Sequence, residues 1–173
     1  MVKIGLLSDT HGYLDEQILS FLKPCDEIWH AGDIGAMETY EQLEQVRPVR
    51  AVYGNIDGGV LRQILPETLS FNIEGLEVMI THIGGYPPRY NSHSQKLLKN
   101  ATPGLFVTGH SHILKIMPDK ARKNMLFINP GAAGRHGFHK MRTLVRFKIH
   151  QAKIEGLEVV ELGPRSPKFK MEN

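Results

Sequence analysis

Residues 2–11, Val-Lys-Ile-Gly-Leu-Leu-Ser-Asp-Thr-His, decide how the rest of the sequence is interpreted. The stretch begins with an apolar run from Val2 to Ser8 that holds one lysine, the pattern of a central strand in a parallel sheet. It ends on Asp9 and His11, and residues i and i+2 of an extended segment point to the same side. The stretch therefore predicts a buried strand that leads directly into a polar site.

The following fifty residues alternate between helical and strand patterns. An apolar stripe at helical spacing over 14–22 is followed by a strand pattern over 25–31. A helix over 36–46, with its glutamates outward, and a short strand over 49–53 come next. This order predicts a parallel sheet with right-handed crossovers.

The remainder of the chain favours strands joined by turns. A Glu-Gly pair at 74–75 between two strand patterns predicts a hairpin, and a second hairpin is expected near the end. A Gly/Pro-rich loop at 84–88 precedes a short helix at 92–99. The expected strands are 68–73, 76–81, 105–108, 113–117, 125–128, 143–150 and 153–161. We expect one domain over 1–162 and a flexible tail over 163–173.

Size and composition are those of a soluble globular protein. The chain has 173 residues, 41% of them hydrophobic and 23% charged, which suits a single domain with its own core. Its one cysteine, Cys25, lies in an apolar stretch, so we expect a buried thiol and a reducing cytoplasm. No signal-peptide pattern and no run of membrane-spanning length is present, so no membrane is expected.

The charge is unevenly distributed along the chain. Residues 1–114 hold 8 Lys and Arg against 13 Asp and Glu, whereas residues 115–173 hold 13 against 5. A basic half can attract a phosphate-bearing partner, and nucleic acid is therefore a possible ligand. It is not the favoured one, because the basic residues are scattered along strands without interleaved aromatic residues.

Polar groups follow the predicted strands in a fixed order. They are Asp9-Thr10-His11, Gly32-Asp33, Gly54-Asn55-Ile56-Asp57, Thr81-His82 and Gly109-His110-Ser111-His112. Ligands of parallel sheets collect beyond the carboxyl ends of the strands, so these groups are expected to meet. Carboxylate, imidazole and amide groups without thiolate suit Mn, Fe, Zn, Ni or Co.

These five groups, in this order, resemble the signature blocks of the calcineurin-like metallophosphoesterases, and within them the small single-domain phosphodiesterases. The likeness spans about residues 1–150. It implies an α/β fold, a four-layer α/β/β/α sandwich of two facing sheets flanked by helices. It also implies a dinuclear metal centre, for which we expect two divalent ions, with manganese as the first choice and Ni, Fe, Zn and Co as alternatives.

The resemblance assigns ligands to each ion. The first ion would be held by Asp9, His11, Asp33 and His112, and the second by Asp33, Asn55, His82 and His110. Asp33 would bridge the pair. A water activated between the ions would attack phosphorus in line, so no protein nucleophile is needed. Asp33, Asn55, Asp57 and His82 are taken as the catalytic residues.

One position departs from the larger members of this family. They carry a histidine after the asparagine of the third block, placed to assist the leaving group, whereas this chain has Ile56. The small phosphodiesterases lack that histidine as well. General-acid assistance is worth about 10²–10⁴-fold, so we expect poor leaving groups to react slowly.

Several residues near the predicted site keep two interpretations. Asp57 either orients a metal-bound histidine or fixes its own turn, and His30 is favoured as a core histidine. Arg135, His136 and His139, in a glycine-rich segment, are candidates for phosphate contact. A substrate rim on the loop after His82 is a weaker possibility, with Tyr86, Arg89, Tyr90 and His93 as candidates.

The leading functional hypothesis is a dinuclear phosphodiesterase acting on a small-molecule phosphoester. A non-catalytic protein-interaction scaffold on the same fold is the first alternative, because the resembled family includes a retromer scaffold subunit. A phosphomonoesterase or nucleotide hydrolase is the second. The resemblance also suggests a homodimer or homotetramer, which no residue pattern of this chain specifies.

Overall fold

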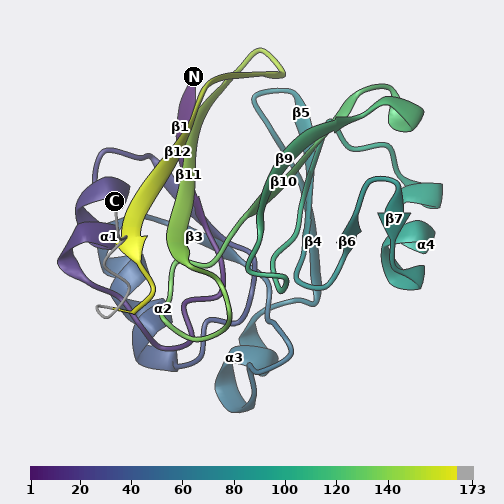
Figure 1. The fold of residues 1–173 in the computed structure, drawn as a ribbon. Coiled ribbons are helices and arrows are strands. Elements are labelled where there is room, and N and C mark those ends of the chain that lie inside the picture. Colours follow the sequence, from purple (N-terminus) through teal and green to yellow (C-terminus); the bar gives the residue numbers. More distant parts are fainter. Residues whose placement is uncertain (167–173) are drawn as a thin grey trace, which may run out of the picture.

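The computed structural model describes residues 1–166 as two five-stranded sheets that face each other (Figure 1). The first sheet has the strand order β12-β11-β1-β2-β3. In its middle, β1 (Val2–Leu7) runs parallel to β2 (Glu27–His30), and β2 runs parallel to β3 (Val49–Ala51). On the other side of β1 lies the antiparallel hairpin of β11 (Met141–His150) and β12 (Lys153–Pro164).

The second sheet has the order β4-β5-β8-β10-β9. Its three inner strands, β5 (Leu76–Thr81), β8 (Leu105–Val107) and β10 (Met125–Pro130), are parallel. Its edges, β4 (Thr68–Ile73) and β9 (Leu114–Asp119), pair in antiparallel fashion. A small separate ribbon is formed by β6 (Gly85–Tyr86) and β7 (Arg89–Tyr90).

Helices cover the outer faces of both sheets, so the molecule has four layers. The helices are α1 (Glu16–Leu22), α2 (Met37–Val46), α3 (Gly59–Ile64) and α4 (Ser92–Asn100), and a 3₁₀ turn spans Lys120–Arg122. In Figure 1, α1 and α2 lie beyond the first sheet and α4 lies beyond the second. The predicted α/β/β/α sandwich is confirmed.

The apolar run of β1 explains why this strand is central. Ile4 and Leu6 point between the two sheets, where they pack with Trp29 in the largest core cluster. Leu7 points to the opposite face and packs against Ile18 of α1 and other residues of the outer layer. Both faces are therefore buried, and burying each such side chain stabilises the fold by about 1.5–3 kcal/mol.

The structure corrects the sequence-based elements in five main places. Helix α3, the β6–β7 ribbon and the 3₁₀ turn were not predicted. Strand β9 begins at Leu114 and not at residue 113. Strand β12 continues to Pro164, and the Arg165 amide then donates to the Lys140 carbonyl, so the expected tail starts later than 163. Residues 167–173 of that tail lie outside the described residues.

The expected burial of Cys25 is confirmed. Within residues 1–166, no helix is long and apolar enough to span a membrane.

Candidate metal centre

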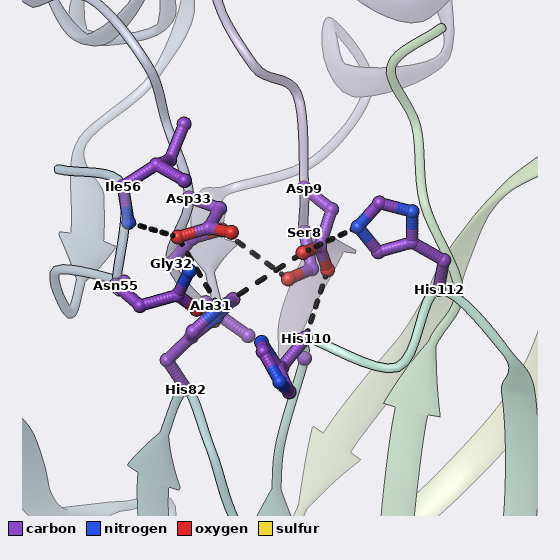
Figure 2. Close-up of polar contacts among 12 residues, drawn as sticks. Ser8, Asp9, Ala31, Gly32, Asp33, Asn55, Ile56, His82, His110 and His112 are labelled. Atoms are coloured by element: carbon purple, nitrogen blue, oxygen red, sulfur yellow. Dashed lines mark hydrogen bonds and ion pairs between the residues drawn. The ribbon is translucent and has the colours of Figure 1, made fainter. Parts of the chain in front are cut away.

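The polar groups that follow five parallel strands meet at one end of the two sheets. Asp9 and His11 follow β1, Asp33 follows β2, and Asn55 follows β3 in the first sheet. From the second sheet, His82 follows β5, and the pair His110 and His112 follows β8. Figure 2 shows the side chains of Asp9, Asp33, Asn55, His82, His110 and His112 turned toward a common centre from both sheets. These strands all run toward the same edge of the two facing sheets, so the residues that follow their carboxyl ends meet there.

The ligand-type atoms form two trios. In one, Asp9, His11 and His112 place their atoms within 4.8 Å of one another. In the other, Asp33, His82 and His110 do the same. Asp33 also lies between the trios, since its Oδ2 is 3.6 Å from His11 Nε2 and its Oδ1 is 3.2 Å from His82 Nε2. The Asn55 Oδ1 atom lies 3.1 Å from His82 Nε2, beside the second trio.

Two buried atoms in the first trio have no hydrogen-bond partner among residues 1–166. They are Asp9 Oδ1 and His11 Nε2, and Asp9 Oδ1 lies 3.1 Å from His112 Nε2. A buried polar atom without a partner costs free energy unless something coordinates it. The set of nitrogen and oxygen donors fits a divalent transition-metal ion, which would satisfy both atoms.

The geometry of His82 leaves one ring nitrogen free for a ligand bond. Its Nδ1 donates to the Ala31 carbonyl at 2.7 Å, which directs Nε2 toward Asp33 (Figure 2). Burial lowers the pKa of His82, but the hydrogen bond with Asp33 and the charge of Asp9 outweigh it, so the pKa is raised. Burial raises the pKa of Asp33, yet its contacts with His82 leave it lowered. A metal ion bound there would compete with a proton for His82.

For His11 and His110 the pKa is shifted in the opposite direction. Burial lowers the pKa of His11, and burial together with the charge of His82 lowers that of His110. Both rings therefore favour the neutral form, which is the form that binds metal ions.

Five of the polar residues adopt a left-handed backbone. The φ angles are 55° at Asp9, 49° at His11, 55° at Asp33, 67° at His110 and 58° at His112. This conformation is uncommon for residues other than glycine, although Asp and His adopt it more readily than most. It turns the chain sharply just after each strand and aims the side chain across the end of the sheet.

Asp57 organises the loops around Asp33 and Asn55. Its Oδ2 accepts from the amides of Ile34 (3.1 Å) and Gly54 (2.8 Å), and its Oδ1 accepts from that of Gly35 (2.8 Å). Of the two roles left open by the sequence, these contacts are those of a carboxylate that fixes turns. The structure records no hydrogen bond from Asp57 to a histidine within residues 1–166.

Replacing Asp57 by asparagine is expected to lower the free energy of unfolding by about 2–3 kcal/mol, because one amide donor then faces a backbone N–H. Metal affinity should fall by about 10–100-fold as the Asp33 loop loosens. Urea unfolding and metal titration measure the two effects. If the variant is destabilised but its metal affinity is unchanged, Asp57 does not help to position the metal ligands.

His30 is a core residue, as the sequence indicated. Its Nδ1 accepts from the Gly32 amide at 3.1 Å, and its Nε2 donates to Thr10 Oγ1 at 2.9 Å. Thr10 in turn donates to the Ile34 carbonyl. Burial lowers the pKa of His30 to about 4, so the ring is neutral at pH 7.

The lowered pKa predicts a loss of stability in acid. Between pH 6.5 and 4 the unfolded chain binds a proton at His30 that the folded chain rejects, so the free energy of unfolding falls as the pH falls. At pH 5 the loss from this group is on the order of 2 kcal/mol relative to pH 7. Urea unfolding of the metal-free protein measures it. A His30→Gln variant should show a shallower pH slope, and an equal slope would contradict the assignment.

The two trios open into a pocket of about 450 Å³. Its far wall is the glycine-rich segment that includes His136, Phe138 and His139. The His136 ring lies 4.7 Å from that of His11, and His139 Nε2 donates to the Gly134 carbonyl. Phe138 is fully exposed on the rim, and the sequence analysis did not single it out. Exposed aromatic residues at a pocket mouth are consistent with ligand contact.

Other residues suspected of substrate contact are placed as follows. The Arg135 guanidinium stacks 4.7 Å above the Tyr13 ring, and Arg135 is not among the residues that line the pocket. Tyr86 is partly exposed beside the centre. For Tyr90 the rim prediction is wrong, because the side chain is buried and its hydroxyl donates to Asp119.

Comparison with known proteins shows which family this chain belongs to. Residues 2–152 match the family model described as a calcineurin-like phosphoesterase superfamily domain. The chain belongs to this superfamily. A curated member from Methanothermobacter thermautotrophicus, described as a probable metallophosphoesterase, is 28% identical over 134 residues. That match covers 75% of this chain and 76% of the relative.

Solved structures with low sequence identity share the fold of this chain. A Vps29 mutant from Entamoeba histolytica has a TM-score of 0.72 at 18% identity, covering 93% of this chain and 99% of its own. A structure described as a novel archaeal phosphodiesterase has a TM-score of 0.71 at 20% identity, covering 92% and 99%. At these identities the likeness establishes the fold alone.

Proposed function

We propose that this protein is a metal-dependent phosphodiesterase with a dinuclear centre. The observation that carries the proposal is the pair of adjacent trios, Asp9–His11–His112 and Asp33–His82–His110, at the floor of an open pocket. Two buried ligand atoms of the first trio lack any partner that the described residues could supply. Two bound cations would supply Lewis-acid polarisation of a phosphoryl group and a water of lowered pKa.

Each residue of the centre has a role in this proposal. Asp33, between the trios, is the shared ligand, and Asn55 adds a neutral oxygen beside His82. The hydrogen bond to Ala31 fixes the His82 ring, so its Nε2 would be available to hold the second ion. We propose Mn²⁺ as the native ion, since carboxylate and imidazole ligands suit it.

The substrate proposed is a small-molecule phosphoester. The pocket of about 450 Å³ has the size of small-molecule sites, which span about 300–1,000 Å³. We place the protein in the cytoplasm, a proposal that the single buried cysteine supports. A homodimer or homotetramer is proposed on family resemblance and is checked by light scattering.

A protein-interaction scaffold is the second candidate, and the fold shared with Vps29 favours it. A scaffold needs no reactive centre, so metal content and hydrolysis separate the two candidates. The unpartnered Asp9 Oδ1 and His11 Nε2 atoms favour the enzyme.

Metal analysis of the purified protein, combined with hydrolysis of bis-(4-nitrophenyl) phosphate in added Mn²⁺, tests the proposal. We expect about two metal equivalents per chain and activity that chelation abolishes. Protein that holds two metal equivalents and hydrolyses no phosphoester would contradict the proposed enzyme and favour the protein-interaction scaffold. Activity on monoesters alone would move the substrate to the phosphomonoesterase class.

The exposed Ile56 at the position after Asn55 predicts a dependence on the leaving group. Ile56 offers no proton, so esters with poor leaving groups should react at least about 10²-fold more slowly than 4-nitrophenyl diesters. Rates across phenols of rising pKa measure this as a steep slope. An Ile56→His variant should flatten the slope, and equal rates on aryl diesters and alkyl monoesters would contradict the prediction.

A further inference from the structure

A second cavity, of about 360 Å³, adjoins the metal pocket. His110, Ser111 and Ile113 line both cavities, so the two lie next to each other. Nothing in the proposed hydrolysis uses this space. It is large enough for a six-membered ring, and small-molecule sites begin at about 300 Å³.

The walls of the second cavity are mainly apolar. Ile83, Tyr86 and Ile113 are 41%, 38% and 63% exposed around it, and the buried Phe127 also lines it. Large apolar side chains gathered around a cavity beside a polar centre mark a ligand site more often than a free surface.

The asparagines of this cavity support its walls. The Asn91 side-chain amide donates to the Ile83 carbonyl at 2.7 Å, and that of Asn129 donates to the Gly109 carbonyl at 2.7 Å. Their amide groups are thus engaged within the protein. The two contacts hold the loops after β5 and β8 in place and so preserve the shape of the cavity.

Two polar groups of the cavity remain available to a ligand. The Lys115 ammonium lies 3.6 Å above the centre of the Tyr86 ring and has no carboxylate partner within residues 1–166. Ser111 Oγ accepts from the Ile113 amide and from Asn129, which leaves its proton free to donate. The cavity therefore combines flat apolar walls with a cation and a hydroxyl donor.

We propose that the second cavity binds an aromatic substituent of the phosphoester, with an acceptor or negative charge at the ring edge facing Lys115. The phosphoryl group would lie at the metal centre and the ring between Ile83, Tyr86 and Ile113. This inference rests on the proposed function for the position of the phosphoryl group. It narrows the substrate class to phosphoesters with an aromatic arm, and Tyr86 and Lys115 are its specificity residues.

Calorimetric binding of three phosphonates to the Mn²⁺-loaded protein tests the proposal without hydrolysis. Phenylphosphonate should bind about tenfold more tightly than methylphosphonate, as stacking on an aromatic side chain predicts. 4-Carboxyphenylphosphonate should bind more tightly still. Tyr86→Ala should remove most of the phenyl preference, and Lys115→Ala should remove the gain from the carboxylate, with methylphosphonate unchanged in both.

Lys153→Ala is the matched control, since it removes an exposed lysine from β12 in the other sheet. Equal binding of methyl- and phenylphosphonate to the unmodified protein, or no binding of either, would overturn the inference. So would a phenyl preference that survives in Tyr86→Ala. Failure of the proposed function is seen separately, as metal-loaded protein that binds these probes and hydrolyses no ester.

Discussion

Replacing Asp33 by asparagine is expected to lower the proposed phosphodiesterase activity by at least about 10³-fold. The Asp33 carboxylate lies 3.6 Å from His11 of one trio and 3.2 Å from His82 of the other. Its exchange removes the negative charge that a shared ligand provides to two cations. Metal content, measured on the same sample, should fall from about two equivalents to one or fewer.

Asp26→Asn is the matched control for this substitution. Asp26 precedes β2 at its amino end, whereas Asp33 follows β2 at the end where the trios meet. The control should keep full metal content and activity. Thermal unfolding of the metal-free proteins verifies that both variants fold. If the Asp33→Asn protein binds two ions and its turnover is unchanged, Asp33 is not a ligand of the centre.

Gly54→Ala should damage the centre almost as severely, although it replaces no polar residue. An added Cβ would meet Asp33 Oδ1 and the Asp33 amide nitrogen and would lie 2.8 Å from the carboxyl carbon. Because the close neighbours include backbone, Asp33 or the loop must shift. Such overpacking costs about 1–3 kcal/mol and displaces a residue that has to be placed within about 0.5 Å. We expect activity and metal affinity to fall by at least about 10²-fold.

Gly58 offers a control four residues further along the same loop. A Cβ added there meets nothing within 4 Å, and its φ of −133° is open to any residue. Gly58→Ala should therefore keep activity and metal content. Measured side by side, the two alanine variants separate a steric effect on Asp33 from a general stiffening of the loop. Equal activity in both would contradict the account.

Strands and family were predictable because their signals are local. The apolar run of β1 is buried on both faces, and the polar groups follow their strands directly, so order and spacing sufficed. Helix α3 was missed because it begins at the Gly58-Gly59 pair and is six residues long, too short for a periodic stripe. The β6–β7 ribbon was hidden in a segment rich in glycine and proline, which reads as loop.

The finer features of the centre depend on contacts that no local pattern encodes. Asp57 accepts from Ile34 and Gly35, which lie 23 and 22 residues before it in the chain. In the second cavity, Tyr86 of β6 contacts Lys115 of β9, although the two strands lie far apart in the sequence. The exposure of Phe138 follows from the path of a loop. Such relations arise only once the chain has folded and distant segments lie side by side.

The left-handed backbone at Asp9, His11, Asp33, His110 and His112 has a consequence for the metal-free protein. A side chain held at positive φ costs about 1 kcal/mol or more where glycine would relax freely. The backbone of the metal-free centre is therefore strained at five ligand-type residues. Substituting glycine for His11 or His112, one at a time, is expected to raise the melting temperature of the metal-free protein while weakening its stabilisation by metal. Weaker metal binding and a higher melting temperature would then appear in the same variant, because both follow from removing a side chain held at positive φ.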